Sequence, residues 1–154
     1  MTHSDLCALG AKYMQEKGLL RFQRPKYVVV EIQTMPGTPR PDIYGFGGAI
    51  TQQIEVKVGR GDFLKDRNKT HRQDPDSDVG ELRSYLCQIG LIKPDEVPPG
   101  WGLLYCDTKN NIRVIKEPSI QESNMRAELT IISSVLRRVK VRPQIFDFRN
   151  EATI

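Results

Sequence analysis

The sequence predicts an α/β domain with a restriction-endonuclease-like core, in which helices flank a central mixed β-sheet. Three observations support this class. Residues 27–34 form a β-branched run that is typical of a strand. Residues 42–46 and 50–58 are predicted to pair as a hairpin around Gly47-Gly48. Residues 121–139 carry apolar residues at helical spacing, which indicates a long amphipathic helix. A chain that mixes strands and helices in this way is typical of α/β domains.

The first half of the chain is punctuated by helix caps, prolines and glycines that divide it into elements. The expected elements, in order, are a helix from Ser4 to about Lys17 that stops at Gly18, a strand at 27–34, a loop at 35–40, the hairpin strands at 42–46 and 50–58, and a short helix from Asp62 to about Lys69.

The second half begins with a polar, turn-rich stretch that we expect to form a loop. Residues 81–89 fit either a helix or a strand. The other expected elements are a loop at 73–79, a loop or turn at 94–100, strands at 101–106 and 112–116, and the helix at 121–139, whose apolar positions are Met125, Leu129, Ile132, Leu136 and Val139.

Length and composition limit the possible classes. A chain of 154 residues predicts one domain, spanning 1–154, with a core at about 27–116. The net charge of +4 permits nucleic-acid binding without requiring it. The cysteines, Cys7, Cys87 and Cys106, lack metal-ribbon spacing, so we expect buried free thiols in a reducing cytoplasm. We expect no membrane span and no signal peptide, because no apolar run approaches about 20 residues.

The most informative pattern is Asp42 followed, after a glycine turn, by Glu55-Val56-Lys57. Alternate residues of a strand share a face, so Glu55 and Lys57 point the same way and Val56 points to the other. If Asp42 lies on the neighbouring hairpin strand, two carboxylates and an ammonium meet on one surface. Such a set can hold a divalent metal ion and polarise water beside a phosphate. The alternative is an exposed, salt-bridged face of an edge strand.

These residues resemble the signature of the PD-(D/E)xK nuclease superfamily. Pro41-Asp42 and Glu55-x-Lys57 are similar to its core motif, and the run from Val58 to Arg67 resembles its MmcB-like branch, which is associated with DNA repair. Tyr85-Leu86-Cys87 and residues 99–105 resemble later strands of that branch. The resemblance covers about residues 27–116. It departs at Gly59, where the branch carries a small polar residue, and in a longer stretch between His71 and Glu81.

The resemblance implies a magnesium- or manganese-dependent nuclease. Asp42 and Glu55 would be the metal ligands, and the backbone carbonyl of Val56 would supply a third oxygen. Lys57 would orient the attacking water or stabilise charge that develops on the phosphate. An extra upstream acid is common in the superfamily, and Glu31, which we expect in the middle of a strand, is the candidate. A solvent-facing strand position is the alternative for Glu31.

A basic stripe follows the motif and is the predicted contact with nucleic-acid phosphates. Its members are Arg60, Lys65, Arg67, Lys69 and Arg72. A solvated helix face with alternating charge is the competing interpretation. A second basic group at the end of the last helix consists of Arg137, Arg138, Lys140 and Arg142. A helix dipole alone is sufficient to explain cations at a helix end.

The resulting hypothesis is a cytoplasmic deoxyribonuclease that acts in DNA repair or processing, with RNA not excluded as substrate. The absence of a visible specificity domain makes a sequence-specific restriction enzyme the less favoured member of this class. Two rivals belong to other classes. One is a nucleic-acid-binding or adaptor module that keeps the fold without cutting, and the other is an α/β protein whose acids are surface charges.

Overall fold

The chain folds around one six-stranded mixed sheet, so the predicted α/β class is confirmed. The structure is a computed structural model that describes residues 1–145; residues 146–154 of the expected domain lie outside the described residues. The strands are β1 (Tyr27–Val30), β2 (Ile43–Phe46), β3 (Gln52–Lys57), β4 (Leu82–Gln88), β5 (Gly102–Cys106) and β6 (Ile112–Lys116). They are ordered β1-β2-β3-β4-β5-β6, with β3, β4 and β5 parallel and the remaining pairs antiparallel.

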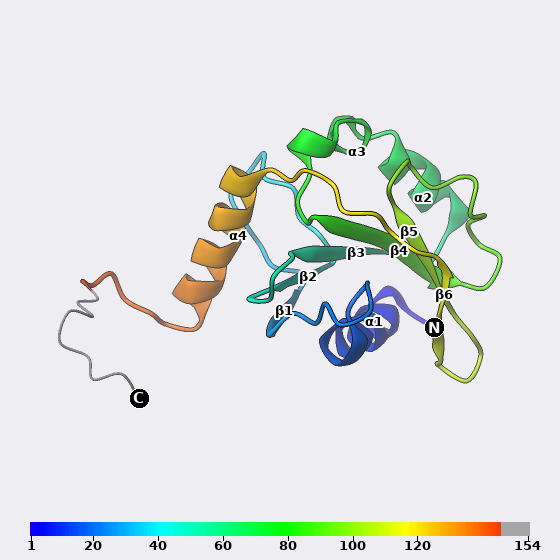
Figure 1. The fold of residues 1–154 in the computed structure, drawn as a ribbon, viewed down its shortest axis with the longest axis horizontal. Helices are drawn as coiled ribbons and strands as arrows, with labels where there is room; N and C mark the ends of the chain where they lie inside the picture. The colour runs from blue at the N-terminus through cyan, green and yellow to red at the C-terminus, as the bar shows by residue number, and fades with distance from the viewer. Residues whose placement is uncertain (146–154) are drawn as a thin grey trace.

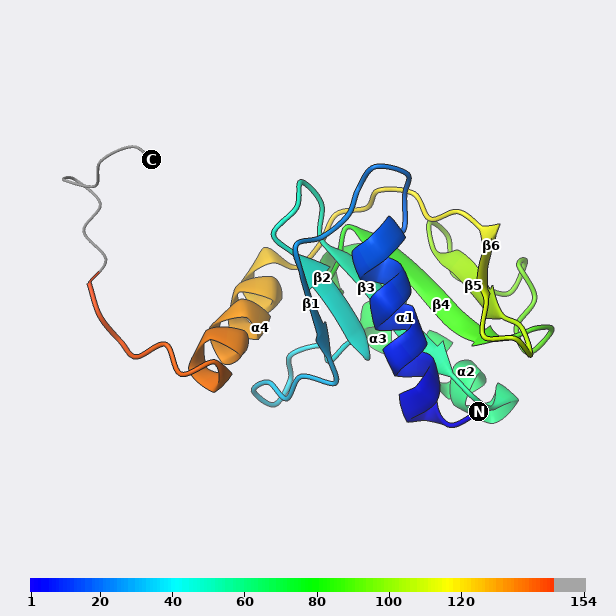
Figure 2. The ribbon, with the colours of Figure 1, turned by 90° about the horizontal axis from the view of Figure 1, so that it is seen from below.

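Helices cover both faces of this sheet (Figure 1). They are α1 (His3–Lys17), α2 (Arg60–Arg67), α3 (Thr70–Gln73), the 3₁₀ helix η1 (Pro75–Ser77) and α4 (Met125–Arg138). The long helix α1 lies across one face, whereas α2 and α3 lie over the other, and α4 stands beside the β1–β2 end (Figures 1 and 2). No helix among residues 1–145 is both long and apolar enough to cross a membrane.

Most element predictions are confirmed, and the differences have local causes. The hairpin of β2 and β3 and the pair β5–β6 form where the turn residues indicate. The ambiguous stretch at 81–89 is a strand, because it lies between β3 and β5 in the parallel part of the sheet. The predicted loop at 73–79 is wrong in part: Thr70–Gln73 forms a helical turn and Pro75–Ser77 a 3₁₀ turn, whose first N–H groups are capped by the side chain of Asp74.

The N-cap of helix α1 lies two residues earlier than the sequence suggested. Thr2, rather than Ser4, is the N-cap, and it exchanges hydrogen bonds with Asp5 in a capping box. Gly18 ends the helix with a φ of 72°, which favours glycine. The helix lies close to the sheet at Gly10, where a Cβ atom would approach the Ile43 and Leu86 side chains to 2.6 and 2.8 Å. Small residues on α1 therefore set its distance from β2 and β4.

Helix α4 is present, but its predicted apolar face does not pack on the sheet. Met125 is 67% exposed, Leu129 is 58% exposed and Val139 is 64% exposed. The buried positions are Ala127, Glu128, Ile131 and Ser134. The carboxylate of Glu128 accepts hydrogen bonds from the backbone N–H of Gly80 (2.7 Å) and the hydroxyl of Thr51 (2.9 Å). A buried polar anchor therefore orients α4, which a count of apolar spacing does not detect.

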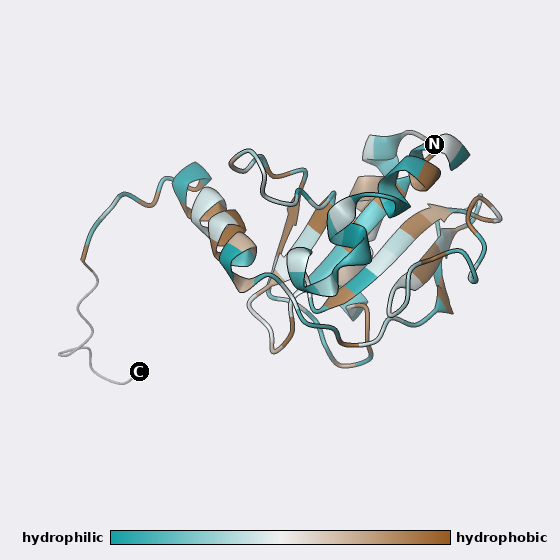
Figure 3. Ribbon diagram, turned by 90° about the horizontal axis from the view of Figure 1, so that it is seen from above, coloured by the Kyte–Doolittle hydropathy of each residue, from teal (hydrophilic) through white to brown (hydrophobic). Residues whose placement is uncertain are grey.

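Hydrophobic residues, brown in Figure 3, occur along the strands, and buried apolar side chains form clusters on both sides of the sheet. Beneath α1, the core includes Leu6, Ile54 and Leu86. Under α2, the ring of Trp101 stacks on that of Tyr85, with ring centroids 4.7 Å apart, which confirms the core placement predicted for Trp101. All three cysteines are buried and free, as expected. These two cores fix the central strand β3 between them.

Candidate functional site

The predicted acids meet where β2 and β3 separate. The antiparallel ladder begins at the pair Ile43–Ile54, so Asp42 lies directly before it and opposite Glu55. The Asp42 carboxylate replaces the missing ladder bond by accepting a hydrogen bond from the backbone N–H of Val56 at 2.8 Å. This contact fixes the Asp42 side chain at the end of the hairpin, next to the Glu55-x-Lys57 motif.

The motif occupies a central strand, so the edge-strand interpretation of Glu55 and Lys57 is wrong. β3 has hydrogen-bonded neighbours on both sides, and all six of its residues are buried. Gln53, Glu55 and Lys57 form a polar row on the face that α2 and α3 cover. Burying such groups is unfavourable unless each has a partner. The row therefore requires compensating groups from the neighbouring helices.

Those partners form a buried ion cluster, which we define as Glu55, Lys57, Asp66, Arg72 and Asp78. Lys57 Nζ lies 3.4 Å from Glu55 Oε2 and 3.5 Å from Asp66 Oδ1. Arg72 Nη2 lies 2.7 Å from Glu55 Oε1, and its other nitrogens contact Asp66 and Asp78. Arg72 also lies over the Trp101 ring, 5.0 Å from its centroid. Three acids and two bases are thus paired largely out of solvent, with one acid in formal excess.

The cluster shifts the protonation of its members in opposite directions. Burial raises the pKa of Glu55 to about 7, and the charge of Asp42 adds to this while Arg72 and Lys57 oppose it. Burial alone would lower the pKa of Lys57, but Glu55 and Asp66 raise it above its ordinary value. Lys57 therefore stays an ammonium at neutral pH.

Asp66 is the acid around which the cluster is organised, and the sequence analysis assigned it no site role. Burial acts to raise its pKa, but Arg72 and Lys57 dominate and lower it well below its ordinary range. The hydroxyl of Tyr85 donates to its Oδ2 at 2.8 Å, and Lys69 Nζ lies 2.7 Å from its Oδ1. An available signal was its position three residues after buried Phe63, which places both on the inner face of a helix.

Glu31 is not in the middle of a strand, as predicted. Strand β1 ends at Val30, and Glu31 adopts a φ of +48°, in the left-handed region that bulky residues rarely occupy. Its backbone N–H donates to the Asp42 carbonyl at 2.8 Å. The side chain is about half exposed and approaches the imidazole of His3, with Glu31 Oε1 3.4 Å from Nδ1.

His3 was missed by the sequence analysis. Its Nε2 lies 3.4 Å from Asp42 Oδ2, so the ring stands between Asp42 and Glu31, and its Nδ1 lies 3.6 Å from the sulfur of Cys7. His3 and Cys7 are separated by four residues of α1, which places them on one helix face. That spacing was visible in the sequence.

The five side chains of the predicted basic stripe differ in their exposure and in their partners. Lys65 is exposed and Arg67 is half-buried on α2. Arg60 pairs with Glu96 rather than with a residue of its own helix. Lys69 is half exposed but pairs with Asp66. Arg72 is buried in the ion cluster, so the prediction that it contacts nucleic-acid phosphates is wrong.

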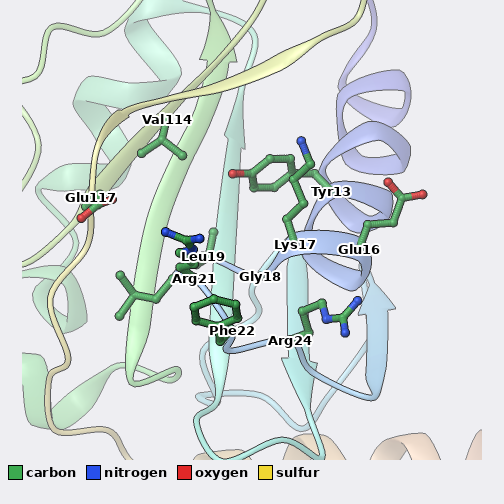
Figure 4. A pocket seen from close by; sticks show the side chains of 11 residues that line it. Tyr13, Glu16, Lys17, Gly18, Leu19, Arg21, Phe22, Arg24, Val114 and Glu117 are labelled. Atoms are coloured by element: carbon green, nitrogen blue, oxygen red, sulfur yellow. The ribbon is translucent and has the colours of Figure 1, made fainter.

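A second basic surface lies at the opposite end of α1 from His3 (Figure 4). A hollow of about 550 Å³ forms between the end of α1, the loop that follows it and Val114 of β6. Phe22 lines this hollow, is 84% exposed and has a φ of +67°. The guanidinium of Arg21 lies over the Phe22 ring. Buried Gln52 holds this loop through the backbone N–H of Leu19 at 2.7 Å. Exposed aromatic and cationic groups in one hollow can contact bases and phosphates.

Comparison with known proteins finds a structure of similar fold whose function is unknown. No protein-family model matches the chain, and no curated protein matches it. Among solved structures, the chain is similar to SPO1766, a protein of unknown function from Silicibacter pomeroyi. The TM-score is 0.62, with 18% sequence identity over 91% of this chain and 90% of that chain. This likeness supports the fold alone.

Proposed function

We propose that this chain is a metal-dependent nuclease that hydrolyses phosphodiester bonds in DNA. The observation that carries the proposal is the junction of β2 and β3, where Asp42 is fixed opposite Glu55 and the Lys57 ammonium contacts the Glu55 carboxylate. Carboxylates beside a fixed ammonium suit a reaction in which a metal ion and a cation share the charge of a phosphate.

The donor set fits Mg²⁺ or Mn²⁺. Asp42 and Glu55 offer carboxylate oxygens, and the backbone carbonyl of Val56 is the proposed third ligand, an all-oxygen set of the kind these ions prefer. Glu55 Oε1 is buried and, among residues 1–145, has no partner in hydrogen-bonding geometry, although Arg72 is near it. The bound ion would supply a water of lowered pKa as nucleophile. Glu31, which the resemblance suggested as a further ligand, instead contacts His3 and belongs to the outer side of this junction.

Each residue of the motif has a separate task in this proposal. Asp42 and Glu55 hold the ion, and the hydrogen bond from Val56 prevents Asp42 from rotating away. Lys57 is held in a charged state by the surrounding acids and provides positive charge for the developing negative charge on the phosphate. Arg72 limits the motion of Glu55, so it positions a ligand rather than touching the substrate.

The proposed substrate is DNA in repair or processing, with RNA not excluded, and the proposed location is the cytoplasm. Lys65 and Arg67 on α2 form no ion pair within residues 1–145, whereas the other members of the predicted stripe, Arg60, Lys69 and Arg72, each pair with an acid. The hollow around Phe22 and Arg21 is a further candidate for contacting the strand. Both surfaces are cationic, which favours a polyanionic partner.

One observation favours a second candidate, the binding or adaptor module that does not cut. Arg72 and Lys57 already compensate Glu55, so the polar row of β3 can be stable without a metal ion. In this alternative, the fold keeps the motif residues as a structural ion cluster, and nucleic-acid binding depends on the exposed cations alone.

A panel of labelled substrates separates the two candidates. Branched, flapped, single-stranded and duplex DNA, together with RNA, would be incubated with wild-type protein and Mg²⁺ or Mn²⁺. The nuclease proposal expects metal-dependent cleavage of at least one substrate. Asp42→Asn should lose metal affinity and activity, with excess Mn²⁺ restoring part of the activity, whereas Asp95→Asn, at an exposed acid distant from the motif in sequence, should match wild type. Binding without cleavage of any substrate would favour the adaptor module.

A further inference from the structure

A second set of ligating atoms lies on the outer side of the same junction. Nδ1 or Nε2 of His3, Sγ of Cys7 and a carboxylate oxygen of Glu31 lie within 4.8 Å of one another. It is the one such group of three or more histidine, cysteine or acidic side chains within the described part of the chain. His3 and Cys7 come from the first turns of α1, and Glu31 directly follows β1, so two segments that are distant in sequence converge here.

The spacing matches tetrahedral coordination. Zinc binds sulfur at about 2.3 Å, histidine nitrogen at about 2.0–2.1 Å and carboxylate oxygen at about 2.0–2.2 Å. At tetrahedral angles, these bonds separate sulfur from nitrogen by about 3.6 Å and nitrogen from oxygen by about 3.4 Å. In the structure, Cys7 Sγ is 3.6 Å from His3 Nδ1, and Nδ1 is 3.4 Å from Glu31 Oε1. These two separations therefore need no rearrangement of the histidine, while the Cys7 and Glu31 ligand atoms lie within 4.8 Å of each other.

The surroundings are also those of a metal-bound histidine. A ligating imidazole generally donates its other ring N–H to a carboxylate, which fixes the ring and its tautomer. Here Nε2 faces Asp42 Oδ2 at 3.4 Å, and Asp42 is itself fixed by the Val56 N–H. Glu31 reaches the histidine from a backbone conformation with φ of +48°. Such conformations are unfavourable and tend to occur at functional sites, because the surrounding structure must stabilise them.

We propose that His3, Cys7 and Glu31 form a binding site for a divalent transition-metal ion of the zinc class, with Asp42 orienting the histidine. Sulfur and imidazole ligands select zinc, cobalt and related ions over Mg²⁺, which prefers oxygen alone. Glu31 is about half exposed and His3 about one third exposed, so solvent can supply the fourth ligand. The site ties the start of α1 to the end of β1, and it does not depend on the nuclease proposal.

Cobalt titration of the full chain tests this site. The protein is freed of metal with a chelator, kept reduced, and titrated with Co²⁺, which gives a near-ultraviolet charge-transfer band when a thiolate binds it. We expect one Co²⁺ per chain, a band that excess Mg²⁺ leaves unchanged, and bleaching when Zn²⁺ displaces cobalt. Cys7→Ser should abolish the band, whereas Cys87→Ser, at another buried free thiol, should retain it.

Further variants guard against a folding defect at the buried Cys7. His3→Gln changes a partly exposed side chain and keeps the thiol, and it should also remove the band and the rise in unfolding temperature that Zn²⁺ produces in wild type. Asp42→Asn should lower Co²⁺ affinity by about 10–100-fold, as expected for loss of a group that orients a ligand. Absence of a band in wild type, or a band that persists in Cys7→Ser, would overturn the site and leave His3 as a bridge between two acids. Neither result depends on whether the protein cleaves DNA.

Discussion

Asp42 and Glu55 are neighbours across one strand junction, but the two carboxylates have opposite surroundings. On the inner side, Glu55 lies in the buried ion cluster with the permanent cations Arg72 and Lys57. On the outer side, Asp42 is partly exposed, and Nε2 of His3 lies 3.4 Å from its Oδ2. The charge of Glu55 is compensated by cations that the fold holds in place, whereas the partner of Asp42 can be replaced.

This difference separates structural from chemical demands on the same motif. Fixed cations make the inner side stable without any ligand, because each buried charge has a counterion. The outer side pairs acids with a histidine and a thiol, which are groups that bind metal ions. We infer that an incoming ion meets Asp42 first and that recruitment of Glu55 requires partial release from Arg72. Variants on the two sides should therefore fail in different ways.

The largest expected effect is loss of stability on the inner side. Arg72→Met should lower the free energy of unfolding by about 3–5 kcal/mol, because Glu55, Asp66 and Asp78 each lose a buried cationic partner. His3→Gln, the corresponding change on the outer side, should cost about 1 kcal/mol or less. Urea unfolding at neutral pH measures both. Lys65→Met, at an exposed cation of α2, is the control, and an Arg72→Met loss no larger than that of the control contradicts the difference between the sides.

A second effect separates catalysis from stability. Lys57→Ala should slow single-turnover cleavage by about 10²–10³-fold while metal and DNA binding stay near wild type, because the ammonium is needed mainly where charge develops. Glu55 and Asp66 lose one of their cations in this variant but keep Arg72. Cleavage rates and metal titration would be compared with those of Asp42→Asn, which should lose metal affinity instead. Wild-type cleavage by Lys57→Ala would remove this lysine from the mechanism.

The contrast between the two sides also shows which parts of the site could be predicted from the sequence. Period-two alternation and the Gly47-Gly48 turn were sufficient to place Glu55 and Lys57 on one face and Asp42 at the start of the adjoining strand, although Asp42 itself lies one residue before β2. These are local consequences of strand geometry. The partners of Glu55 could not be predicted, because Arg72 reaches it from another element and looked like one more surface cation. Burial is a property of the assembled fold.

The outer side failed to be predicted for a different reason. Glu31 was expected in a continuing strand, since its neighbours are β-branched, yet the chain leaves the sheet after Val30. His3 and Cys7 had the spacing of helix neighbours, but nothing in the sequence indicates that the start of α1 packs against the end of β1. The exposed apolar face of α4 is a similar case, because its buried anchor, Glu128, is polar. Long-range packing decided all three.

A third, smaller effect is the pH dependence of stability. It shows whether burial or the charge of Arg72 dominates the pKa of Glu55. The pKa of Glu55 is about 7 in the folded chain, against an ordinary value of about 4.5. The folded state then binds more protons than the unfolded state between these values. The stabilising contribution is complete below about pH 4.5 and is lost as the pH rises through about 7.

Comparison with Glu55→Gln isolates this contribution. The free energy of unfolding of wild type minus that of Glu55→Gln should fall by on the order of 2 kcal/mol between about pH 5 and about pH 8. Urea unfolding of metal-free protein at both pH values provides the measurement. If the stability of wild type relative to Glu55→Gln instead grows with pH, Arg72 holds Glu55 ionised throughout this range. Glu55 and Arg72 would then form an ion pair that does not take up a proton.

The smallest expected effect concerns which side of the sheet meets nucleic acid. Lys65 extends from α2 on the inner side, whereas Arg21 lies in the hollow on the α1 side, next to the exposed Phe22 ring. A phosphate contact contributes about 0.9 to the slope of log affinity against log salt concentration. Wild type should therefore bind DNA more tightly than a variant that has lost one contact, and this advantage should become about 3.5-fold smaller as the salt concentration rises from about 50 to about 200 mM.

Binding of labelled DNA would be measured for Lys65→Glu, Arg21→Glu and, as a control in the β5–β6 turn, Lys109→Glu. We expect Lys65→Glu to show this salt-dependent loss, because α2 adjoins the motif. If Arg21→Glu alone shows it, the strand follows the α1 side and approaches the junction past His3 rather than past Lys57. Equal, salt-independent behaviour of all three variants would assign both surfaces to ordinary solvated charge.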